Sequence, residues 1–295
     1  MFQGSMVALV TPMQEDGTID KKAFKELIEW QIRSQTKALI IAGTTGEGST
    51  LSHAEQEEVI RLAVAQAAGR VAIIAGTGSN STQITIELSL NAKKAGAKAC
   101  LVVTPYYNKP TQEGLYLHFK AVAETVDLPL ILYNVPGRTG CDLLPETIER
   151  LAKLPQIIGI KEATGKVERA TEILKRCGNH FAVYSGDDAT ALDLLLHGAK
   201  GIISVTANVV PVKMAALCEA ALQGDAAAAH KLNQELLNLH HKLFVEANPI
   251  PVKWALQQMG AIPAGLRLPL TPLDIRFHAE LTQAMQQAGV VLEHA

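Results

Sequence analysis

The sequence lacks an excess of charge of either sign: 27 lysines and arginines stand against 29 aspartates and glutamates, for a formal net charge of -2. This balance produces no broad field that would hold a nucleic-acid backbone or an anionic lipid surface. We therefore expect neither nucleic acid nor a membrane as a partner. With 295 residues and 48% apolar content, the chain can bury a sizeable core in one large domain or two.

Long apolar runs, a basic leader and clustered cysteines are also missing. The N-terminal apolar stretch, residues 6–10, is shorter than a signal-peptide core or a membrane span, so we expect a cytoplasmic protein. The four cysteines stand far apart, without a C-x-x-C pair or a histidine at a ligand spacing: Cys100, Cys141, Cys177 and Cys218. This pattern predicts buried free thiols, and the sequence offers no obvious metal site.

What the sequence does contain is a rhythm of short, β-branched apolar runs, each followed by a segment with apolar residues at helical spacing. Such alternation is typical of βα units. The runs are nearly continuous in their apolar character, which is typical of parallel strands buried on both faces. Eight strands are predicted, at residues 6–10, 38–42, 71–75, 99–103, 130–134, 157–161, 181–185 and 201–205.

Eight parallel strands either form an open, doubly wound sheet or close into a (β/α)8 barrel. Eight repeats that end near residue 223 favour the α/β TIM barrel, which we place at residues 1–223 as the catalytic domain. Residues 224–295 have no strand signal and predict a C-terminal helical extension, broken at residues 248–251 (NPIP) and packed on the barrel.

Lys161 ends an apolar strand, and by the alternation of strand side chains it shares a face with Ile157 and Gly159. If that face points into the barrel, Gly159 leaves room beside the amine. Burial disfavours the charged form of a lysine, and the free amine is a nucleophile that can attack a ketone and form a Schiff base. The alternative is a strand-end lysine that reaches solvent or pairs with Glu162 or Glu168.

Other polar residues also follow strand ends, where barrels of this class carry their chemistry. Tyr133 has the parity to point toward Lys161 and to move protons during imine formation; the alternative is a core tyrosine with a satisfied hydroxyl. Thr44 and Thr45 lie in a glycine-bounded turn suited to a carboxylate, or else in a capping turn with Ser49, Thr50 or Ser52.

Arg138 follows a Pro-Gly turn after the fifth strand. Its planar, permanently charged guanidinium suits a substrate carboxylate. The alternative is an ordinary surface ion pair, which the residues alone do not exclude.

Six motifs together resemble the dihydrodipicolinate synthase family, the 4-hydroxy-tetrahydrodipicolinate synthases of bacterial lysine biosynthesis. The likeness covers essentially the whole chain. The motifs are residues 43–47 (GTTGE), 104–110 (TPYYNKP), 133–139 (YNVPGRT), 158–165 (IGIKEATG), 184–188 (YSGDD) and 248–254 (NPIPVKW).

The resemblance implies a lyase of the class I aldolase type that needs no metal and no organic cofactor. It implies that Lys161 condenses with pyruvate, and that the resulting enamine attacks L-aspartate 4-semialdehyde in the diaminopimelate route to lysine. The implied proton relay consists of Tyr133, Thr44 and Tyr107, with Tyr107 reaching into a neighbouring subunit. A homotetramer built as a dimer of dimers is therefore expected.

The resemblance also implies substrate-binding roles. Thr45, with the backbone at Gly186 and Ile203, would cradle pyruvate, and Arg138 would bind the carboxylate of the semialdehyde. A related alternative is another pyruvate-dependent aldolase, such as an N-acetylneuraminate lyase or a 2-keto-3-deoxy sugar acid aldolase. Arg138 argues against it, because a sugar acid needs hydroxyl partners there. A sensor that kept the barrel and lost its chemistry is the alternative from a different class.

Feedback control by lysine is the point where the sequence departs from the family pattern. His53, Asn80 and Tyr106 match the interfacial lysine site of sensitive members and are candidate allosteric residues. Ile84 stands where such members carry a carboxylate, and Gln56 where many carry a histidine. We expect weak inhibition by lysine or none, unless a nearby acid substitutes: Glu55, Glu57 or Glu58.

Overall fold

The computed structural model describes residues 2–292. Within this range eight parallel strands pair in chain order, and the last pairs with the first to close a barrel. They are β1 (Gly4–Ala8), β2 (Ala38–Ile41), β3 (Ala72–Gly76), β4 (Ala99–Val103), β5 (Leu130–Asn134), β6 (Ile157–Glu162), β7 (Ala182–Ser185) and β8 (Gly201–Ser204). The predicted TIM barrel is confirmed.

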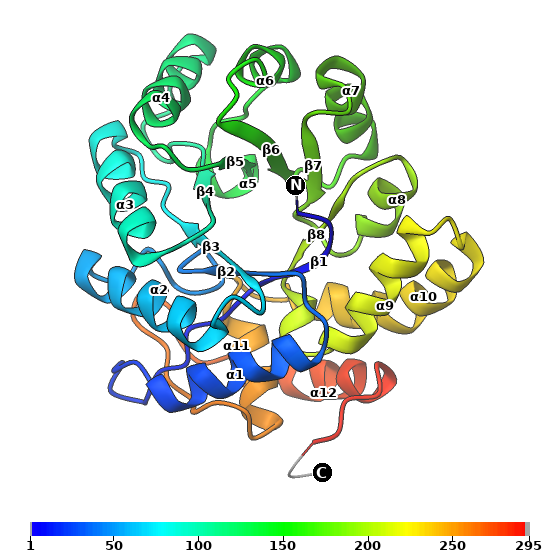
Figure 1. Cartoon of the computed structure of the whole chain (residues 1–295). Helices are drawn as coiled ribbons and strands as arrows, with labels where there is room; N and C mark the ends of the chain where they lie inside the picture. Colours follow the sequence, from blue (N-terminus) through cyan, green and yellow to red (C-terminus); the bar gives the residue numbers. More distant parts are fainter. Residues whose placement is uncertain (1, 293–295) are drawn as a thin grey trace.

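Helices form a ring around the strands, and α10 and α12 lie outside that ring (Figure 1). The helices of the barrel are α1 (Lys21–Arg33), α2 (His53–Ala67), α3 (Thr82–Ala95), α4 (Gln112–Thr125), α5 (Pro136–Thr139), α6 (Pro145–Leu151), α7 (Val167–Cys177), α8 (Ala191–Leu196), the 3-10 turn η1 (Thr206–Asn208) and α9 (Pro211–Leu222). Hydroxyl and carboxylate caps fix where several begin, among them Asp20 for α1 and Ser81 for α3.

The C-terminal extension is helical, as predicted. It contains α10 (Ala226–Lys242), α11 (Ile250–Gln258), the 3-10 turn η2 (Ile275–Phe277) and α12 (His278–Gln287), and residues 293–295 lie outside the described range. The predicted boundary at residue 223 falls in the turn between α9 and α10, which pack against each other. We propose this turn as the boundary between barrel and extension.

Alternating strand side chains divide between two apolar cores. Met6 and Ile131 belong to a core inside the barrel, whereas Val7 and Leu132 belong to a larger core between the strands and the helices. All four cysteines are free and buried in this outer core, as predicted. Both faces of every strand are therefore covered, which explains the nearly continuous apolar runs in the sequence.

A bulge in the pairing of β5 with β6 changes which residues face inward. Leu130 lies opposite Ile157, but Ile131 lies opposite Gly159, so β6 contains one extra residue. The extra residue reverses the alternation, and Ile157 belongs to the outer core. The prediction that Lys161 shares a face with Ile157 is wrong for this reason, although Lys161 does point to the inside.

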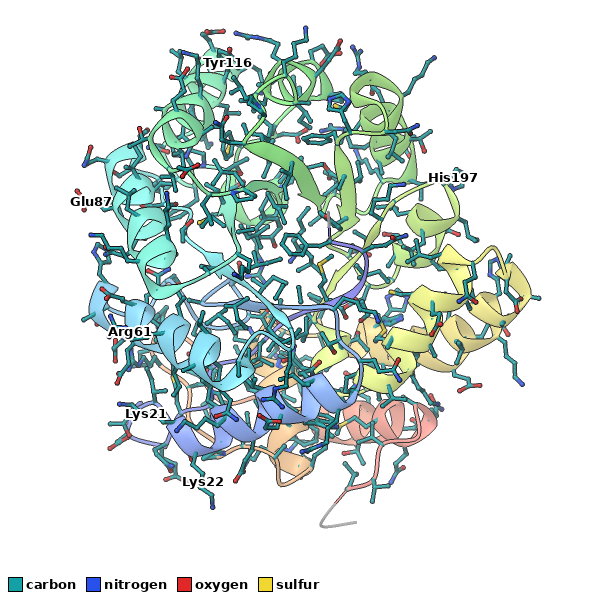
Figure 2. The ribbon with its side chains drawn as sticks, in the orientation of Figure 1. Lys21, Lys22, Arg61, Glu87, Tyr116 and His197 are labelled. Atoms are coloured by element: carbon teal, nitrogen blue, oxygen red, sulfur yellow. The ribbon has the colours of Figure 1, made fainter. Side chains whose placement is uncertain are left out.

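The outer surface of the ring is polar. Lys21, Arg61 and Glu87 project outward from α1, α2 and α3 (Figure 2). Across residues 2–292, the structure contains no helix with the length and apolar character needed to cross a bilayer.

Candidate active site

A cavity of about 510 Å³ opens at the carboxyl ends of the strands. It brings together five residues singled out from the sequence for catalysis or substrate binding, which are Thr44, Thr45, Tyr133, Arg138 and Lys161. They come from the loop after β2, from β5 and α5, and from β6. Residues that lie far apart in the sequence therefore face one space at the end of the barrel where catalytic groups are usually found.

Lys161 is buried in the barrel wall without a charged partner. It is 5% exposed, and among residues 2–292 its amine takes part in no ion pair and no hydrogen bond. Its nitrogen lies 4.4 Å from the centre of the Tyr133 ring. Glu162 bonds to Asn134 and to a backbone amide instead. The alternatives of a solvent-exposed or carboxylate-paired lysine are therefore wrong.

The glycine that makes room for Lys161 is not the predicted one. A Cβ atom at Gly159 would meet the backbone oxygen of Ala182 at 2.4 Å, so Gly159 allows β7 to approach closely. A Cβ atom at Gly186 would lie 2.8 Å from Cε of Lys161 and 2.8 Å from Cβ of Ala163. Gly186, at the end of β7, is therefore the residue whose missing side chain accommodates the lysine.

Tyr133 pairs directly with Lys161 across β5 and β6. Its side chain is 7% exposed, yet no hydrogen bond within the described part of the chain reaches its hydroxyl. Tyr184 is the contrasting case, because its hydroxyl donates to the carbonyl of Phe2 at 3.0 Å and burial raises its pKa. Tyr133 is therefore a tyrosine at the cavity whose hydroxyl is open to a ligand, and not a satisfied core tyrosine.

The turn that carries Thr44 and Thr45 does not cap a helix. Helix α2 begins eight residues later, where Ser52 and Glu55 form a reciprocal capping box. Thr45 is buried, and its hydroxyl oxygen accepts a hydrogen bond from Asn248 at 2.9 Å. Of the predicted cap candidates only Ser52 has that role, which leaves Thr44 and Thr45 facing the cavity.

Arg138 lies exposed on the single turn of α5 at the mouth of the cavity. One of its terminal nitrogens donates to the carbonyl of Asn248 at 3.2 Å. None of the ion pairs found between residues 2 and 292 includes Arg138, so the alternative of an ordinary surface ion pair is wrong. A fixed positive charge without a carboxylate partner at a cavity mouth suits an anionic ligand.

Three further residues predicted for catalysis or pyruvate binding do not line the cavity of their own chain: Tyr107, Gly186 and Ile203. Tyr107 is 87% exposed and has a φ of 75°, in the left-handed region. Its backbone amide donates to Thr139 at 3.1 Å. The amide of Gly186 donates to the carbonyl of Glu162 at 2.8 Å, which ties β7 to β6 beside Lys161. Ile203 is buried inside the barrel opposite Met6 of β1.

The predicted allosteric residues line the same cavity. His53, Asn80 and Tyr106 line it together with Gln56 and Ile84. The cavity is therefore continuous between the amine of Lys161 and this second group of residues.

A polar network on the outer face of β5 and β6 supports the site, and sequence reasoning did not identify it. Asn134 donates to Asp142 at 2.8 Å and to Glu162 at 3.2 Å, and Arg169 forms two hydrogen bonds with Asp142. Burial raises the pKa of Glu162. For Asp142 burial acts in the same direction, but Arg169 and Asn134 outweigh it and the pKa is lowered. The network fixes the strands that carry Tyr133 and Lys161.

The arrangement suits imine chemistry. A buried amine without a counter-ion can attack a carbonyl carbon, and the nearby phenol can give or take the proton that this step requires. Within the described range, the structure holds no group of three or more His, Cys, Asp and Glu side chains arranged to bind a metal ion.

Comparison with known proteins gives one consistent result. Residues 1–288 match the model of the dihydrodipicolinate synthetase family. The 4-hydroxy-tetrahydrodipicolinate synthase of Alcanivorax borkumensis is 59% identical over 99% of both chains, and that of Pseudomonas aeruginosa is 58% identical over 99% of this chain and 100% of its own.

Solved structures agree. A dihydrodipicolinate synthase from Acinetobacter baumannii, complexed with pyruvate, superposes with a TM-score of 0.98 at 54% identity over 99% of this chain and 100% of that one. An enzyme from Cyanidioschyzon merolae with lysine bound has a TM-score of 0.95 at 40% identity over 98% of this chain and 99% of that one.

The close approach of Gly186 to Lys161 predicts that Gly186→Ala displaces the amine from Tyr133. We expect imine formation with a small 2-oxo acid, measured by borohydride trapping, to slow on the order of 10- to 100-fold, because misplacement of a reacting group carries a penalty of that size. Gly137→Ala is the matched control, since a Cβ atom there meets no atom within 4 Å. An unchanged trapping rate in Gly186→Ala would contradict the packing argument.

Proposed function

The chain belongs to the dihydrodipicolinate synthetase family, and we propose that its cavity carries out the lyase reaction of that family, in which pyruvate condenses with L-aspartate 4-semialdehyde to give 4-hydroxy-tetrahydrodipicolinate. The observation that carries this proposal is the buried amine of Lys161, which lies 4.4 Å from the centre of the Tyr133 ring. Within residues 2–292 no carboxylate pairs with this amine, and Arg138, which lines the same cavity, forms no ion pair.

The first half of the reaction joins pyruvate to Lys161. The amine attacks C2 of pyruvate, and the oxygen on C2 takes up protons and leaves as water, so that an imine remains. Tyr133 supplies one of these protons, since no residue of the described range bonds to its hydroxyl and its ring lies 4.4 Å from the amine. Thr44 and Tyr107 continue the proton path. Thr45 holds the carboxylate of pyruvate and, with the backbone at Gly186 and Ile203, cradles the molecule.

The second half forms the carbon–carbon bond. A proton leaves the methyl group of the imine, and the enamine carbon attacks the aldehyde carbon of the semialdehyde, whose oxygen becomes a hydroxyl group. The substrate's own amino group then displaces Lys161, which closes the ring and frees the lysine. Arg138 binds the carboxylate of the semialdehyde, a role that its unpaired charge at the cavity mouth supports.

Borohydride trapping with two variants tests this division of roles. With pyruvate and borohydride, mass spectrometry should find the adduct on Lys161, and Lys161→Ala should give none. Arg138→Ala should still trap pyruvate but lose about 10- to 150-fold in use of the semialdehyde, the effect of one lost charged hydrogen bond. An adduct on another lysine would refute the mechanism, and an equal loss of trapping in Arg138→Ala would refute the role of the arginine.

We propose further that two chains complete each site, within a homotetramer built as a dimer of dimers. The exposure of Tyr107, 87% in a single chain, supports a role toward a neighbouring subunit. If Tyr107 acts across the interface, a mixture of inactive Tyr107→Phe and inactive Lys161→Ala subunits should regain activity, because a mixed dimer contains one intact site. Absence of recovery despite subunit exchange, verified by native mass spectrometry, would mean that one chain builds each site.

The part of the cavity lined by His53, Asn80 and Tyr106 supports at most weak control by lysine. Ile84 offers no acceptor to an ammonium group, and the acids considered as substitutes are engaged elsewhere: Glu55 with Arg267, Glu57 with Arg61 and Glu58 with Lys21. One missing charged contact weakens affinity by about 100-fold.

An inhibition curve at saturating pyruvate tests this expectation. Half-inhibition should need more than about 1 mM lysine, and Ile84→Glu should lower that concentration by restoring a carboxylate. Half-inhibition of the unmodified protein at clearly lower lysine would contradict the expectation.

A further inference from the structure

The turn that carries Thr44 and Thr45 ends at Glu47, a residue in an unfavourable backbone conformation. Its φ is 54°, in the left-handed region, and its side chain is fully buried. A residue other than glycine stays in this region only when its surroundings hold it there. The contacts of Glu47 therefore decide whether the turn keeps its shape.

The Glu47 carboxylate is held by two groups of the C-terminal extension. One oxygen bonds to the ammonium group of Lys253, on α11, and the other accepts the backbone amide of Arg267 at 3.1 Å. The ammonium group of Lys253 also donates to the carbonyl of Thr11 at 3.0 Å, and the hydroxyl of Thr11 donates to the carbonyl of Gly46 at 2.7 Å. Lys253 is therefore bonded to the turn directly and through Thr11.

The ion pair is among the most buried in the molecule, with side-chain exposures of 3% for Lys253 and 0% for Glu47. Burial lowers the pKa of Lys253, and the Glu47 carboxylate opposes that shift. Removing one member of such a pair leaves an uncompensated buried charge, which forces the surrounding structure to rearrange. The turn that contains Glu47 is part of that surrounding structure.

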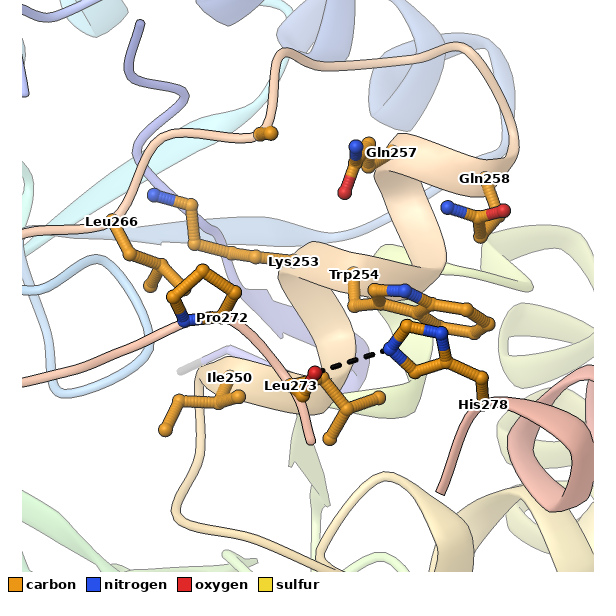
Figure 3. Close-up of a pocket in the computed structure, with 10 residues that line it drawn as sticks. Ile250, Lys253, Trp254, Gln257, Gln258, Leu266, Pro272, Leu273 and His278 are labelled. Carbon is orange, nitrogen blue, oxygen red and sulfur yellow. Dashed lines mark hydrogen bonds between the residues drawn. The ribbon is translucent and has the colours of Figure 1, made fainter. Parts of the chain in front are cut away.

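Lys253 also lines a pocket beside α11, together with Trp254, Leu266 and His278. In Figure 3 its side chain extends past Leu266, while Trp254 stacks on His278 farther along the helix. Neither Lys253 nor Glu47 lines the cavity that contains Lys161. Any effect of Lys253 on the reaction must therefore act through the turn.

We propose that Lys253 is a positioning residue of the reaction, which through Glu47 fixes the turn that presents Thr44 and Thr45 to pyruvate. This inference rests on the proposed function, because Thr45 is assigned there to the carboxylate of pyruvate. The pair serves the pyruvate half of the site, whereas Arg138 serves the semialdehyde half.

Lys253→Met, which keeps the length of the side chain without its charge, tests the proposal. The half-saturating pyruvate concentration in borohydride trapping should rise, or the trapping rate fall, on the order of 10- to 100-fold. The KM for the semialdehyde should stay within about twofold of the unmodified value, because Arg138 keeps its position. Lys242→Met is the matched control: it makes the same substitution in the Lys242–Glu280 pair, which joins α10 to α12 away from the turn.

Glu47→Gln gives a second test, which decides the case if Lys253→Met fails to fold. It should show the same pyruvate defect, and the double variant should lose no more than the worse single variant, because the two residues act as one unit. Two losses that multiply would overturn the proposal. The proposal would also be overturned if the variants unfold at a lower temperature but trap pyruvate as readily as the unmodified protein. The ion pair would then stabilise the fold without positioning the turn. If the unmodified protein itself traps no pyruvate on Lys161, it is the proposed function that fails.

Discussion

The amine of Lys161 is held in the barrel wall against the ring of Tyr133, and no carboxylate between residues 2 and 292 pairs with it. An amine buried without a counter-ion beside a cavity is placed to act as a nucleophile toward a bound carbonyl compound. Much of the surrounding structure maintains this condition. Glu162, the adjacent acid in the sequence, is directed to the opposite face of β6, where Asn134 and the amide of Thr164 bind it.

Two devices keep the lysine in place. The absent side chain of Gly186 leaves the space that Cε and Cγ of Lys161 occupy. On the outer face, the network of Asn134, Asp142 and Arg169 joins β5 to the start of α7 and so fixes the strand that carries Tyr133. The reacting pair is thus placed by strand pairing and packing, which are more rigid than loops.

The substrate-binding groups are placed differently, by contacts from the distant C-terminal extension. Asn248 donates to Thr45 and accepts from Arg138, so one residue contacts groups proposed for both substrates. Lys253 adds the buried ion pair with Glu47. Two residues of the extension, Asn248 and Lys253, therefore help to shape the mouth of the cavity.

The fold could be predicted closely from the sequence, because buried strands and amphipathic helices follow from local patterns that survive in the folded chain. The sequence also singled out the residues that lie at or just after the carboxyl end of a strand, which are Lys161, Tyr133, Thr44 and Arg138. The bulge opposite Ile131 could not be predicted from the sequence, since the register of a strand depends on its partner strand. The contacts of Asn248 with Thr45 and of Lys253 with Glu47 could not be predicted either, because the partners are 203 and 206 positions apart in the sequence.

The central claim is that pyruvate becomes covalently attached to the buried amine of Lys161. A crystal structure of the protein treated with pyruvate and borohydride tests it most directly. We expect continuous density from C2 of pyruvate to Nζ of Lys161, with the carboxylate against the turn of Thr44 and Thr45. The hydroxyl of Tyr133 should lie within about 2.6 to 3.2 Å of the former carbonyl oxygen site or its nearest water. Pyruvate bound beside an unmodified Lys161, or joined to a different lysine, would contradict it.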